Sequence, residues 1–422
     1  MKNLYDLREA LTEVIGKCLS PVLKSPKNNT LKTIKGKKTA LETISRDFKI
    51  RPSKPTVWVS ATSFGDFNIA RPLVDKLQDQ CNIIITFNKS EAYEAYTQPV
   101  AKYDNIFYLP VDSVTNAKSF IDCVKPSAAV FVESDLPTNY LATLKATGIP
   151  AFLISAKAGD DLLKGKLGSI FHKNFSSFEK IFTAEDVTAE KLRKMGLSNV
   201  ETSGDPLFDN AMAVAMEPYT NDVVERFKGN KPLFIAGSIH MDDDLDMIER
   251  LAGEFTDVRF LIVPQDVSPK KITEIKKRLG LNIPSYTEII YGAPLPPANS
   301  LIVNYKGDLA KLYRYADFVY VGGGFGKSLH SLIEPIVYGL PISFGPNIKN
   351  SPIAQIMDER GVGERFSTYP QLRMWISSLL TDSGRKDEVK RKAQKLFEEH
   401  TGATDIIVKD ILKAAKGSQA AK

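Results

Sequence analysis

A short turn that carries one carboxylate, Ser63-Phe64-Gly65-Asp66, stands between the apolar run 56–61 and a stretch of helical spacing over 68–80. A carboxylate held at the end of a buried strand can take the proton from an attacking hydroxyl, which is general base catalysis. An acid at the start of a helix can equally cap that helix, because it accepts hydrogen bonds from backbone N–H groups that lack a partner. The sequence leaves both roles open for Asp66.

A run of glycines, followed directly by Lys327, ends the predicted strand 316–324 and comes before a predicted helix. Glycines allow a close approach between backbone and ligand, and N–H groups at a helix start attract phosphate. The run is not a Walker loop, since the position five residues before Gly326 is Val321 rather than glycine. A phosphate site and a tight turn without a ligand both fit the pattern.

Other polar residues stand where further predicted strands end. They are Glu133, Ser134 and Asp135; Gly237, Ser238 and His240; Pro264 and Gln265; and His330 with Glu334 beyond the glycines. The carboxyl ends of parallel strands share one edge of a sheet, and doubly wound sheets bind their ligands at that edge. We therefore expect these side chains to gather there.

The composition restricts the classes of function. With 422 residues the chain is long for one hydrophobic core, so two domains are expected. Its net charge of +6 suits anionic partners without choosing among them. The cysteines and histidines show no ligand spacing, which predicts neither a metal site nor a disulfide framework. No apolar stretch reaches about 18 residues, and the basic run is not interleaved with aromatic residues, so neither a membrane-spanning helix nor nucleic-acid binding is expected.

From residue 55 onward, short apolar runs alternate with predicted helices, a pattern typical of buried parallel sheets with helices on both faces. The predicted strands are 56–61, 82–87, 105–111, 128–134, 150–156, 180–185 and 200–204, then 231–238, 259–264, 300–305, 316–324 and 341–346. The sequence therefore predicts an α/β protein with two doubly wound domains, at 51–217 and 218–422, that would share one ligand cleft.

Residues 1–50 form a separate N-terminal segment in this interpretation. Apolar residues recur at helical spacing from Leu4 to Val22, and seven lysines with no acid lie between Val14 and Leu41. An apolar stripe beside a basic run can bind an anionic membrane surface. A helix packed on the body, followed by a solvated lysine-rich linker, is the other interpretation. We predict that residues 1–40 bind an anionic membrane surface.

Several segments resemble motifs of the 3-deoxy-D-manno-octulosonic acid (Kdo) transferases of lipopolysaccharide synthesis. The strongest is ADFVYVGGGFGKSLHSLIEPIVYGLPISFGPNI, residues 316–348, which is similar to the family's A-D-x-x-[YF]-[VI]-G-G-[GS] and H-N-x-L-E segments with the following F-G-P. VSATSFGDFNIARPLVDKL, residues 59–77, is similar to its [HS]-x-x-S-x-G-E turn. Segments 131–158, 178–209, 234–244 and 261–267 resemble the family's other motifs, in the same order.

The resemblance implies a GT-B fold, with two Rossmann-like domains facing a cleft. It implies inverting transfer of Kdo from CMP-Kdo to a lipid A precursor, without a metal or other cofactor, by a peripheral protein on the cytoplasmic face of the bacterial inner membrane. Asp66 would be the general base, and Ser63, Gly65 and Glu133 would bind the acceptor. The donor would be bound by Gly237, Ser238, Pro264, Gln265, Gly323, Gly324, Phe325, Gly326, Lys327, Ser331 and Glu334.

Several polar positions depart from the family's motifs. The family's glutamate is Asp66, whose shorter side chain retracts the acid by about 1.5 Å. A family cation is Leu207, a histidine is Gln265 and an asparagine is Ser331. These changes leave two hypotheses open: a working glycosyltransferase, or a catalytically impaired homologue that acts as a binding or scaffold protein at the membrane.

Overall fold

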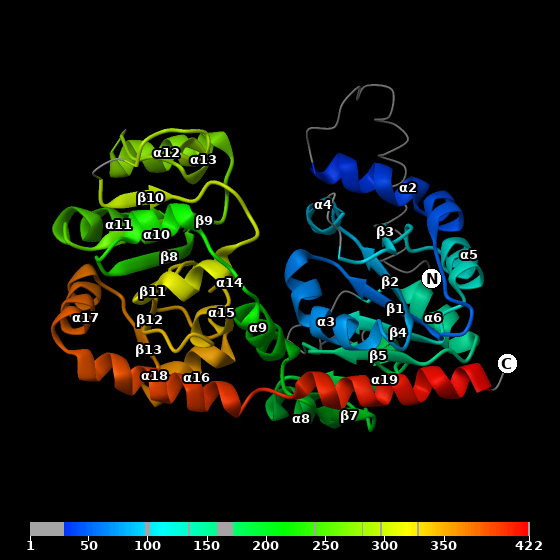
Figure 1. The fold of residues 1–422 in the computed structure, drawn as a ribbon. Helices are drawn as coiled ribbons and strands as arrows, with labels where there is room; N and C mark the ends of the chain where they lie inside the picture. The colour runs from blue at the N-terminus through cyan, green and yellow to red at the C-terminus, as the bar shows by residue number, and fades with distance from the viewer. Residues whose placement is uncertain are drawn as a thin grey trace. The chain divides into compact units, whose positions relative to one another are not determined.

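The computed structural model describes residues 29–97, 102–133, 136–157, 172–239, 242–280, 282–295, 298–326 and 329–420. The chain divides into two compact units (Figure 1). The first contains the described residues up to Asn210 together with those from Thr401 onward, and the second contains Ala211–His400.

The first unit is built on a parallel sheet with the strand order β3-β2-β1-β4-β5-β6-β7. Its strands are β1 (Thr56–Ala61), β2 (Asn82–Phe87), β3 (Ile106–Tyr108), β4 (Ala128–Val132), β5 (Ala151–Ile154), β6 (Lys180–Thr183) and β7 (Val200–Thr202). Its helices are α2 (Asn29–Asp47), α3 (Phe64–Leu77), α4 (Ser90–Tyr96), α5 (Val114–Val124), α6 (Thr138–Ala146), α8 (Asp186–Lys194), the first part of α9 (Pro206–Met216), and α19 (Ala403–Ala420).

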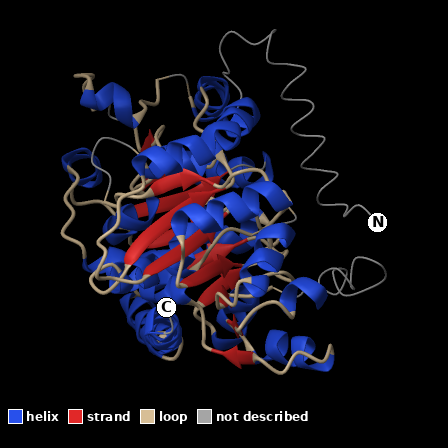
Figure 2. Ribbon diagram, turned by 90° about the vertical axis from the view of Figure 1, so that its right-hand side faces the viewer, coloured by secondary structure: helices blue, strands red, loops and turns tan. Residues whose placement is uncertain are grey.

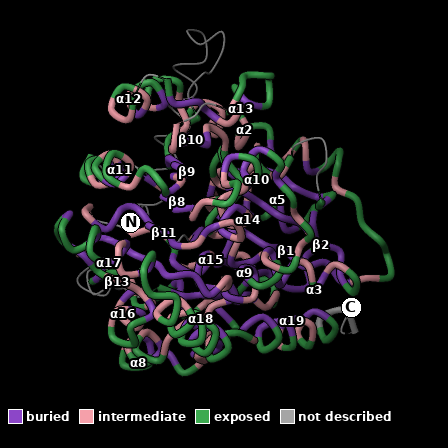
Figure 3. The backbone as a smooth tube through the Cα atoms, turned by 60° about the vertical axis from the view of Figure 1, so that its left-hand side comes forward, coloured by how far each residue is buried: buried purple, intermediate pink, exposed green. Residues whose placement is uncertain are grey.

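Both faces of this sheet are buried, which is why its strands read as continuous apolar runs. Along β1, Trp58 packs in a core with residues of α5 and α6, whereas Val57 and Val59 pack on the other face with α3 and α19. Figure 2 shows the strands enclosed by helices, and Figure 3 shows the strands buried while outer turns of the helices are exposed. The side chains of β1 therefore pack against helices on both faces of the sheet.

The second unit repeats the plan with the strand order β10-β9-β8-β11-β12-β13. Its strands are β8 (Leu233–Ile239), β9 (Arg259–Pro264), β10 (Ser300–Ile302), β11 (Phe318–Val321), β12 (Ile342–Phe344) and β13 (Gly363–Arg365). Its helices are α10 (Asp222–Lys228), α11 (Asp242–Glu254), α12 (Pro269–Leu279), α13 (Tyr286–Ile290), α14 (Leu309–Leu312), η2 (Tyr313–Tyr315), α15 (Ile333–Ile336), α16 (Pro352–Arg360), α17 (Tyr369–Thr381) and α18 (Ser383–Glu398).

In each unit the strand order reverses beside the first strand. β1 lies between β2 and β4, and β8 lies between β9 and β11, all in parallel. Chains that leave two neighbouring strands toward opposite faces open a crevice at the carboxyl edge, and this is where such sheets bind ligands. The prediction of two doubly wound parallel sheets is confirmed.

The C-terminal helix corrects the predicted domain boundary. The sequence analysis placed 218–422 in the second domain, but Ile407 and Ile411 of α19 are fully buried in the core of the first unit, beside α3 and β4. The first boundary between the units was predicted between residues 217 and 218. It lies earlier, between Asn210 and Ala211 inside α9. The amphipathic pattern of a helix does not tell which of two sheets will bury its apolar stripe.

The basic N-terminal region is partly a packed helix. Within α2, Ala40 and Ile44 are buried, and the helix packs against β3, α4 and α5 of the first unit. One of the two interpretations made the lysine-rich run a solvated linker, but over 29–47 it is helical. The apolar stripe from Leu4 to Val22 lies outside the described residues. Each helix within the described residues is too short or too polar to cross a membrane.

We predict that Asp209 anchors α19 to the first unit. Its two carboxylate oxygens accept hydrogen bonds from the backbone N–H groups of Gly402 (2.7 Å) and Thr404 (2.8 Å), at the start of that helix. Asp209→Ala leaves these N–H groups without an acceptor, so the free energy of unfolding should fall by about 1–2 kcal/mol. Urea unfolding measures this change.

Lys409→Ala is the control for this prediction, because Lys409 is an exposed residue of the same helix. Equal losses in the two variants would contradict the anchoring role of Asp209.

Candidate active site

The turn after β1 is a reciprocal cap of α3. Ser63 is the N-cap residue, and its Oγ accepts a hydrogen bond from the Asp66 N–H at 3.2 Å. In return, Asp66 Oδ2 accepts from the backbone N–H groups of Thr62 and Ser63, both at 3.0 Å. This capping box also explains why α3 begins at Phe64 rather than at residue 68, because the cap satisfies the N–H groups of an earlier first turn.

The capping role of Asp66 is therefore observed, while its role as a base stays a prediction. The cap holds the carboxylate where β1 ends, and Ser63 Oγ lies 2.7 Å from Asp66 Oδ1. The carboxylate is half-buried rather than enclosed, and Gly65 in the same turn is exposed. A rigidly held carboxylate at a ligand-binding edge is suited to accept a proton.

Glu133 supplies a second carboxylate at the same edge, directly after β4. Its backbone has the positive φ of 59°, which is uncommon for a residue with a side chain, and its N–H donates to the Ile154 carbonyl at 3.0 Å. Its side chain forms an ion pair with Lys157 at 2.5 Å. Burial raises the pKa of Glu133, Lys157 opposes the rise, and the carboxylates of Asp66 and Asp205 add to it.

Asp205 completes a group of three interacting carboxylates. Its Oδ1 accepts from Ser155 Oγ at 3.2 Å and from the Leu207 N–H at 3.0 Å. Burial is the main cause that raises the pKa of Asp205. The Leu207 side chain packs against the core beside α3 and α19, so an apolar contact occupies the position of the family's cation.

The sequence analysis missed Ser155, Lys157 and Asp205 as members of this site. Ser155 and Lys157 follow β5, the strand next to β4, and Asp205 follows β7. The sequence signal that could have identified these residues is their position after apolar runs. Ser134 and Asp135 lie outside the described residues.

The second unit gathers its predicted residues at the carboxyl edge around β8. A bulge between Gly237 and Ile239 interrupts the pairing with β9, and Ser238 inside it has a φ of 56°. Such a bulge redirects a side chain at the end of a strand. Pro264 pairs with Ile239 and is buried, whereas the next residue, Gln265, is exposed.

The glycine segment forms a turn, and among the residues described after it the first helix begins only at Ile333. Gly326 N–H donates to the Gly323 carbonyl at 3.0 Å, and the next helix, α15, starts only at Ile333. The glycine segment was expected to lead from a strand directly into a helix. The strand is confirmed, but the helix that follows starts later than expected. Lys327 lies outside the described residues. A Cβ on Gly324 would lie 2.6 Å from the Gly345 N atom, so this close approach requires glycine.

The hydrogen bonds of this turn occupy its carbonyl groups. The carbonyls of Gly324 and Phe325 accept from the backbone N–H and the side-chain amide of Asn347, at 2.8 and 3.2 Å. In the described part of the chain, the N–H groups of Gly324 and Phe325 have no such partner. A turn that keeps N–H groups available while its carbonyls are engaged suits an anion.

The predicted residues beyond the turn lie on or before α15. Ser331 Oγ accepts from the Ile333 N–H at 3.3 Å, so this hydroxyl holds the turn that leads into the short helix, whose N-cap residue is Leu332. Glu334 lies close enough to the buried Tyr313 to raise the pKa of its hydroxyl, although burial is the larger cause. Tyr313 was not expected from the sequence, because its pattern is that of a core aromatic residue.

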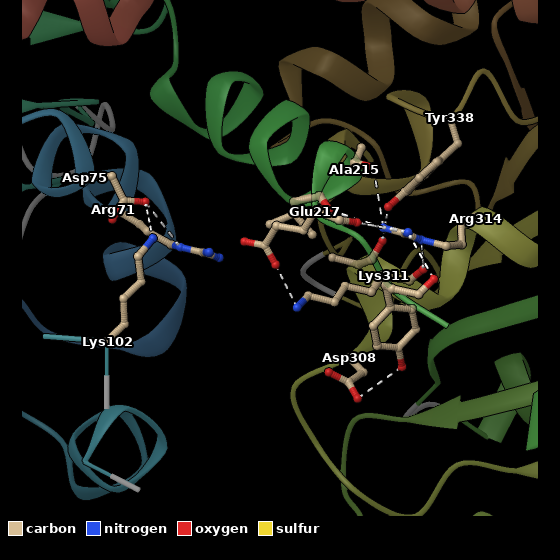
Figure 4. A network of polar contacts seen from close by, with 12 residues as sticks. Arg71, Asp75, Lys102, Ala215, Glu217, Asp308, Lys311, Arg314 and Tyr338 are labelled. Atoms are coloured by element: carbon tan, nitrogen blue, oxygen red, sulfur yellow. Dashed lines mark hydrogen bonds and ion pairs between the residues drawn. The ribbon is translucent and has the colours of Figure 1, made fainter. Parts of the chain in front are cut away.

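Arg314, the residue after Tyr313, holds the end of α9 within the second unit. Its guanidinium donates to the carbonyls of Val214 (3.3 Å), Glu217 (3.1 Å) and Tyr219 (3.3 Å), and Figure 4 shows it directed toward this segment. The carbonyls at a helix end lack partners inside the helix, so a half-buried cation is well placed there. The chain entering the second unit is thus tied to η2, directly before β11 and the glycine turn.

Comparisons with known proteins support the resemblance found in the sequence. Residues 37–210 match the family model described as 3-deoxy-D-manno-octulosonic-acid transferase (kdotransferase). The transferase of that name from Aquifex aeolicus is 26% identical over 341 residues, 79% of this chain and 88% of the relative. The one from Haemophilus influenzae is 23% identical over 385 residues, 86% of this chain and 87% of the relative. These matches confirm the resemblance of this chain to the Kdo transferase family.

Solved structures agree with the fold expected for the Kdo transferase family. UDP-GlcNAc 2-epimerase from Neisseria meningitidis is similar with a TM-score of 0.61 and 13% identity, covering 85% of this chain and 100% of that structure. MurG from Acinetobacter baumannii is similar with a TM-score of 0.51 and 15% identity, covering 85% and 99%. Together with the two parallel sheets, these likenesses confirm the GT-B type of fold.

We predict that Glu133 lowers the stability of the fold at neutral pH. The pKa of Glu133 is raised in the folded protein, so folding takes up a proton between its unfolded and folded values. The free energy of unfolding should therefore fall as the pH rises through that window. Glu133→Gln removes this titration, so the variant should gain stability over the wild type as the pH is raised toward neutrality.

Urea unfolding at several pH values measures the difference. Glu190→Gln is the control, because Glu190 is an exposed glutamate of the same unit. A stability difference for Glu133→Gln that does not change with pH would contradict the prediction.

Proposed function

We propose that this protein transfers Kdo from CMP-Kdo to a lipid A precursor in lipopolysaccharide synthesis. The observation that carries the proposal is a set of interacting carboxylates at one sheet edge, in a chain that resembles the Kdo transferase family and whose second sheet ends in an anion-type turn. The relatives named above are Kdo transferases, which supports the same activity here. No metal or other cofactor takes part in the proposed reaction.

In the proposed step, Asp66 is the general base. The acceptor hydroxyl oxygen attacks the anomeric carbon of Kdo, and the bond from that carbon to the CMP phosphate oxygen breaks. The hydroxyl proton passes to the Asp66 carboxylate, and CMP leaves with the electron pair. The raised pKa of Glu133 makes this second carboxyl an acid or base of suitable strength near the acceptor. Attack opposite the leaving group inverts the anomeric centre.

On the donor side, the N–H groups of Gly324 and Phe325 would bind the CMP phosphate. The Glu334 carboxylate would accept hydrogen bonds from nucleotide hydroxyls, since an ionised carboxylate offers acceptors only. Ser238, redirected by its bulge, and Pro264 would line the same site, together with Gly237, Gly323 and Gly326. Contributions from Gln265, Ser331 and Lys327 remain part of the proposal.

A set of substitutions separates capping from catalysis at Asp66. Asp66→Asn keeps an oxygen that can cap α3 but removes the base, so kcat should fall at least about 100-fold while the thermal unfolding temperature changes little. Asp66→Glu keeps both functions, because serine with glutamate three residues later forms the same box. The measurement is Kdo transfer from CMP-Kdo, generated in place, to a tetraacylated lipid A precursor.

Ser63→Ala is the matched control, since it removes the cap and keeps the carboxylate. It should lower the unfolding free energy by about 1 kcal/mol and reduce kcat far less than Asp66→Asn. Full activity in Asp66→Asn would reject Asp66 as the base, and loss of activity only in Glu133→Gln would transfer that role to Glu133.

The comparisons lend no support to the alternative of a catalytically impaired scaffold protein. The Leu207 side chain packs against the core, and the Ser331 hydroxyl accepts from the Ile333 N–H, so two of the departures have local structural reasons. Absence of both sugar transfer and CMP binding in the wild-type protein would favour the scaffold.

We further propose that α2 holds the protein on the anionic cytoplasmic face of the inner membrane, where a lipid acceptor would be found. Lys35 and Lys38 are exposed on α2, while Ala40 and Ile44 face the core. The double substitution Lys35→Glu and Lys38→Glu should weaken binding to vesicles of mixed anionic and zwitterionic lipid by about 10-fold or more, since each basic residue contributes about 1 kcal/mol.

Vesicle sedimentation measures this binding, and Lys413→Glu with Lys409→Glu on α19 is the control for net charge. Charge reversal on α2 is a sharper test than deleting residues 1–40, because such a deletion would also remove part of the packed helix. Unchanged binding of the α2 variant would contradict the proposed attachment.

A further inference from the structure

Beneath the glycine turn lies a buried carboxylate that the sequence analysis did not single out. Asp244, in the first turn of α11, is fully buried. The Tyr320 hydroxyl of β11 donates to its Oδ1, and the Gly323 N–H donates to its Oδ2 at 3.2 Å. A buried carboxylate is costly unless donors satisfy its oxygens, and here one of those donors is the backbone of the turn.

The surrounding chain leaves little freedom for this contact. A Cβ on Gly322 would lie 2.5 Å from the Ser238 carbonyl oxygen and 3.0 Å from Asp244 Oδ2, so the backbone passes directly over the carboxylate. Tyr320 is itself fully buried, and the pKa of its hydroxyl is raised by burial and by Asp244. The carboxylate therefore has a fixed position relative to the turn.

The hydrogen bond from the Gly323 N–H to Asp244 helps to fix the orientation of the peptide groups that follow Gly323. Gly323 has a φ of 93°, a conformation in which the chain reverses, and Asp244 accepts the N–H of this residue. The Gly324 and Phe325 carbonyls are engaged by Asn347 from the other side. The Gly323 carbonyl in turn accepts from the Gly326 N–H. Because each N–H shares a peptide plane with the carbonyl of the preceding residue, the held Gly323 and Gly324 carbonyls set the orientation of the Gly324 and Phe325 N–H groups, and Asp244 holds the peptide group just before them.

We infer that Asp244 is a positioning residue for phosphate recognition at the donor site, acting through the backbone of the glycine turn. It orients two N–H groups toward the phosphate of a cytidine nucleotide and does not contact the nucleotide. The inference rests on the proposed function, because the turn is the proposed phosphate site. Loss of such a positioning residue should weaken binding of the phosphate group and leave binding of the nucleoside unchanged.

Comparing CMP with cytidine tests this directly. Calorimetric titration of the purified full-length protein, with cytidine measured by competition against CMP, gives the two affinities. Asp244→Ala should weaken CMP at least about tenfold, since hydrogen bonds to a charged group are among the stronger ones, and leave cytidine nearly unchanged. Asp244→Asn retains one acceptor oxygen for the Gly323 N–H and should recover most of the CMP affinity.

Asp242→Ala is the control, because Asp242 lies in the same helical turn but is exposed. Should Asp244→Ala fail to fold, Tyr320→Phe tests the same contact. It removes the donor to Oδ1, and CMP binding should weaken while cytidine binding does not.

Equal losses for CMP and cytidine, or unchanged CMP binding in Asp244→Ala, would overturn the inference while leaving the proposed function standing. Wild-type protein that binds cytidine and CMP equally would overturn both, because no phosphate site would then exist at this turn.

Discussion

In each sheet the first strand, β1 or β8, pairs in parallel with a strand on either side, and the rest of the structure depends on this constraint. It buries both faces of each sheet, and it brings the ends of neighbouring strands to one edge. Asp66, Glu133, Asp205 and the glycine turn each follow the end of a strand. Without the reversal of strand order beside β1 and β8, the loops after these strands and their neighbours would not open an edge for a ligand.

Local hydrogen bonding and chemistry share the same residues at these edges. Asp66 caps α3, the Ser331 hydroxyl accepts from the Ile333 N–H at the start of α15, and both are candidates for contact with substrate. A cap fixes the position of a side chain, which is also what a catalytic or binding group needs. The two roles of Asp66 are therefore compatible, since capping occupies backbone donors while the half-buried carboxylate stays open to its surroundings.

The two units place their charges differently. The first unit collects carboxylates, and burial together with their mutual repulsion raises the pKa of Glu133. The second unit presents backbone N–H groups at a turn supported from below by Asp244. An acidic edge suits proton transfer from a hydroxyl, and an edge of N–H groups suits a phosphate. This division is consistent with a transferase that has its acceptor and donor sites on separate sheets.

The alternation of apolar runs and helices by itself determined the two parallel sheets, because a strand buried on both faces needs continuous apolar residues. The order of the motifs indicated the resemblance to the Kdo transferases, and their positions after apolar runs located Asp66, Glu133 and the glycine turn.

Only the tertiary structure decided that α19 belongs to the first unit, that Asp205 and Lys157 lie near Glu133, and that Asp244 supports the glycine turn. An acid in a run of three aspartates reads as solvated, although Asp244 shares a helical stripe with Ile248 and Leu251. The physical reason is that residue spacing describes one element at a time. Which side chain meets which across elements depends on how those elements pack, and packing brings together residues far apart in the chain.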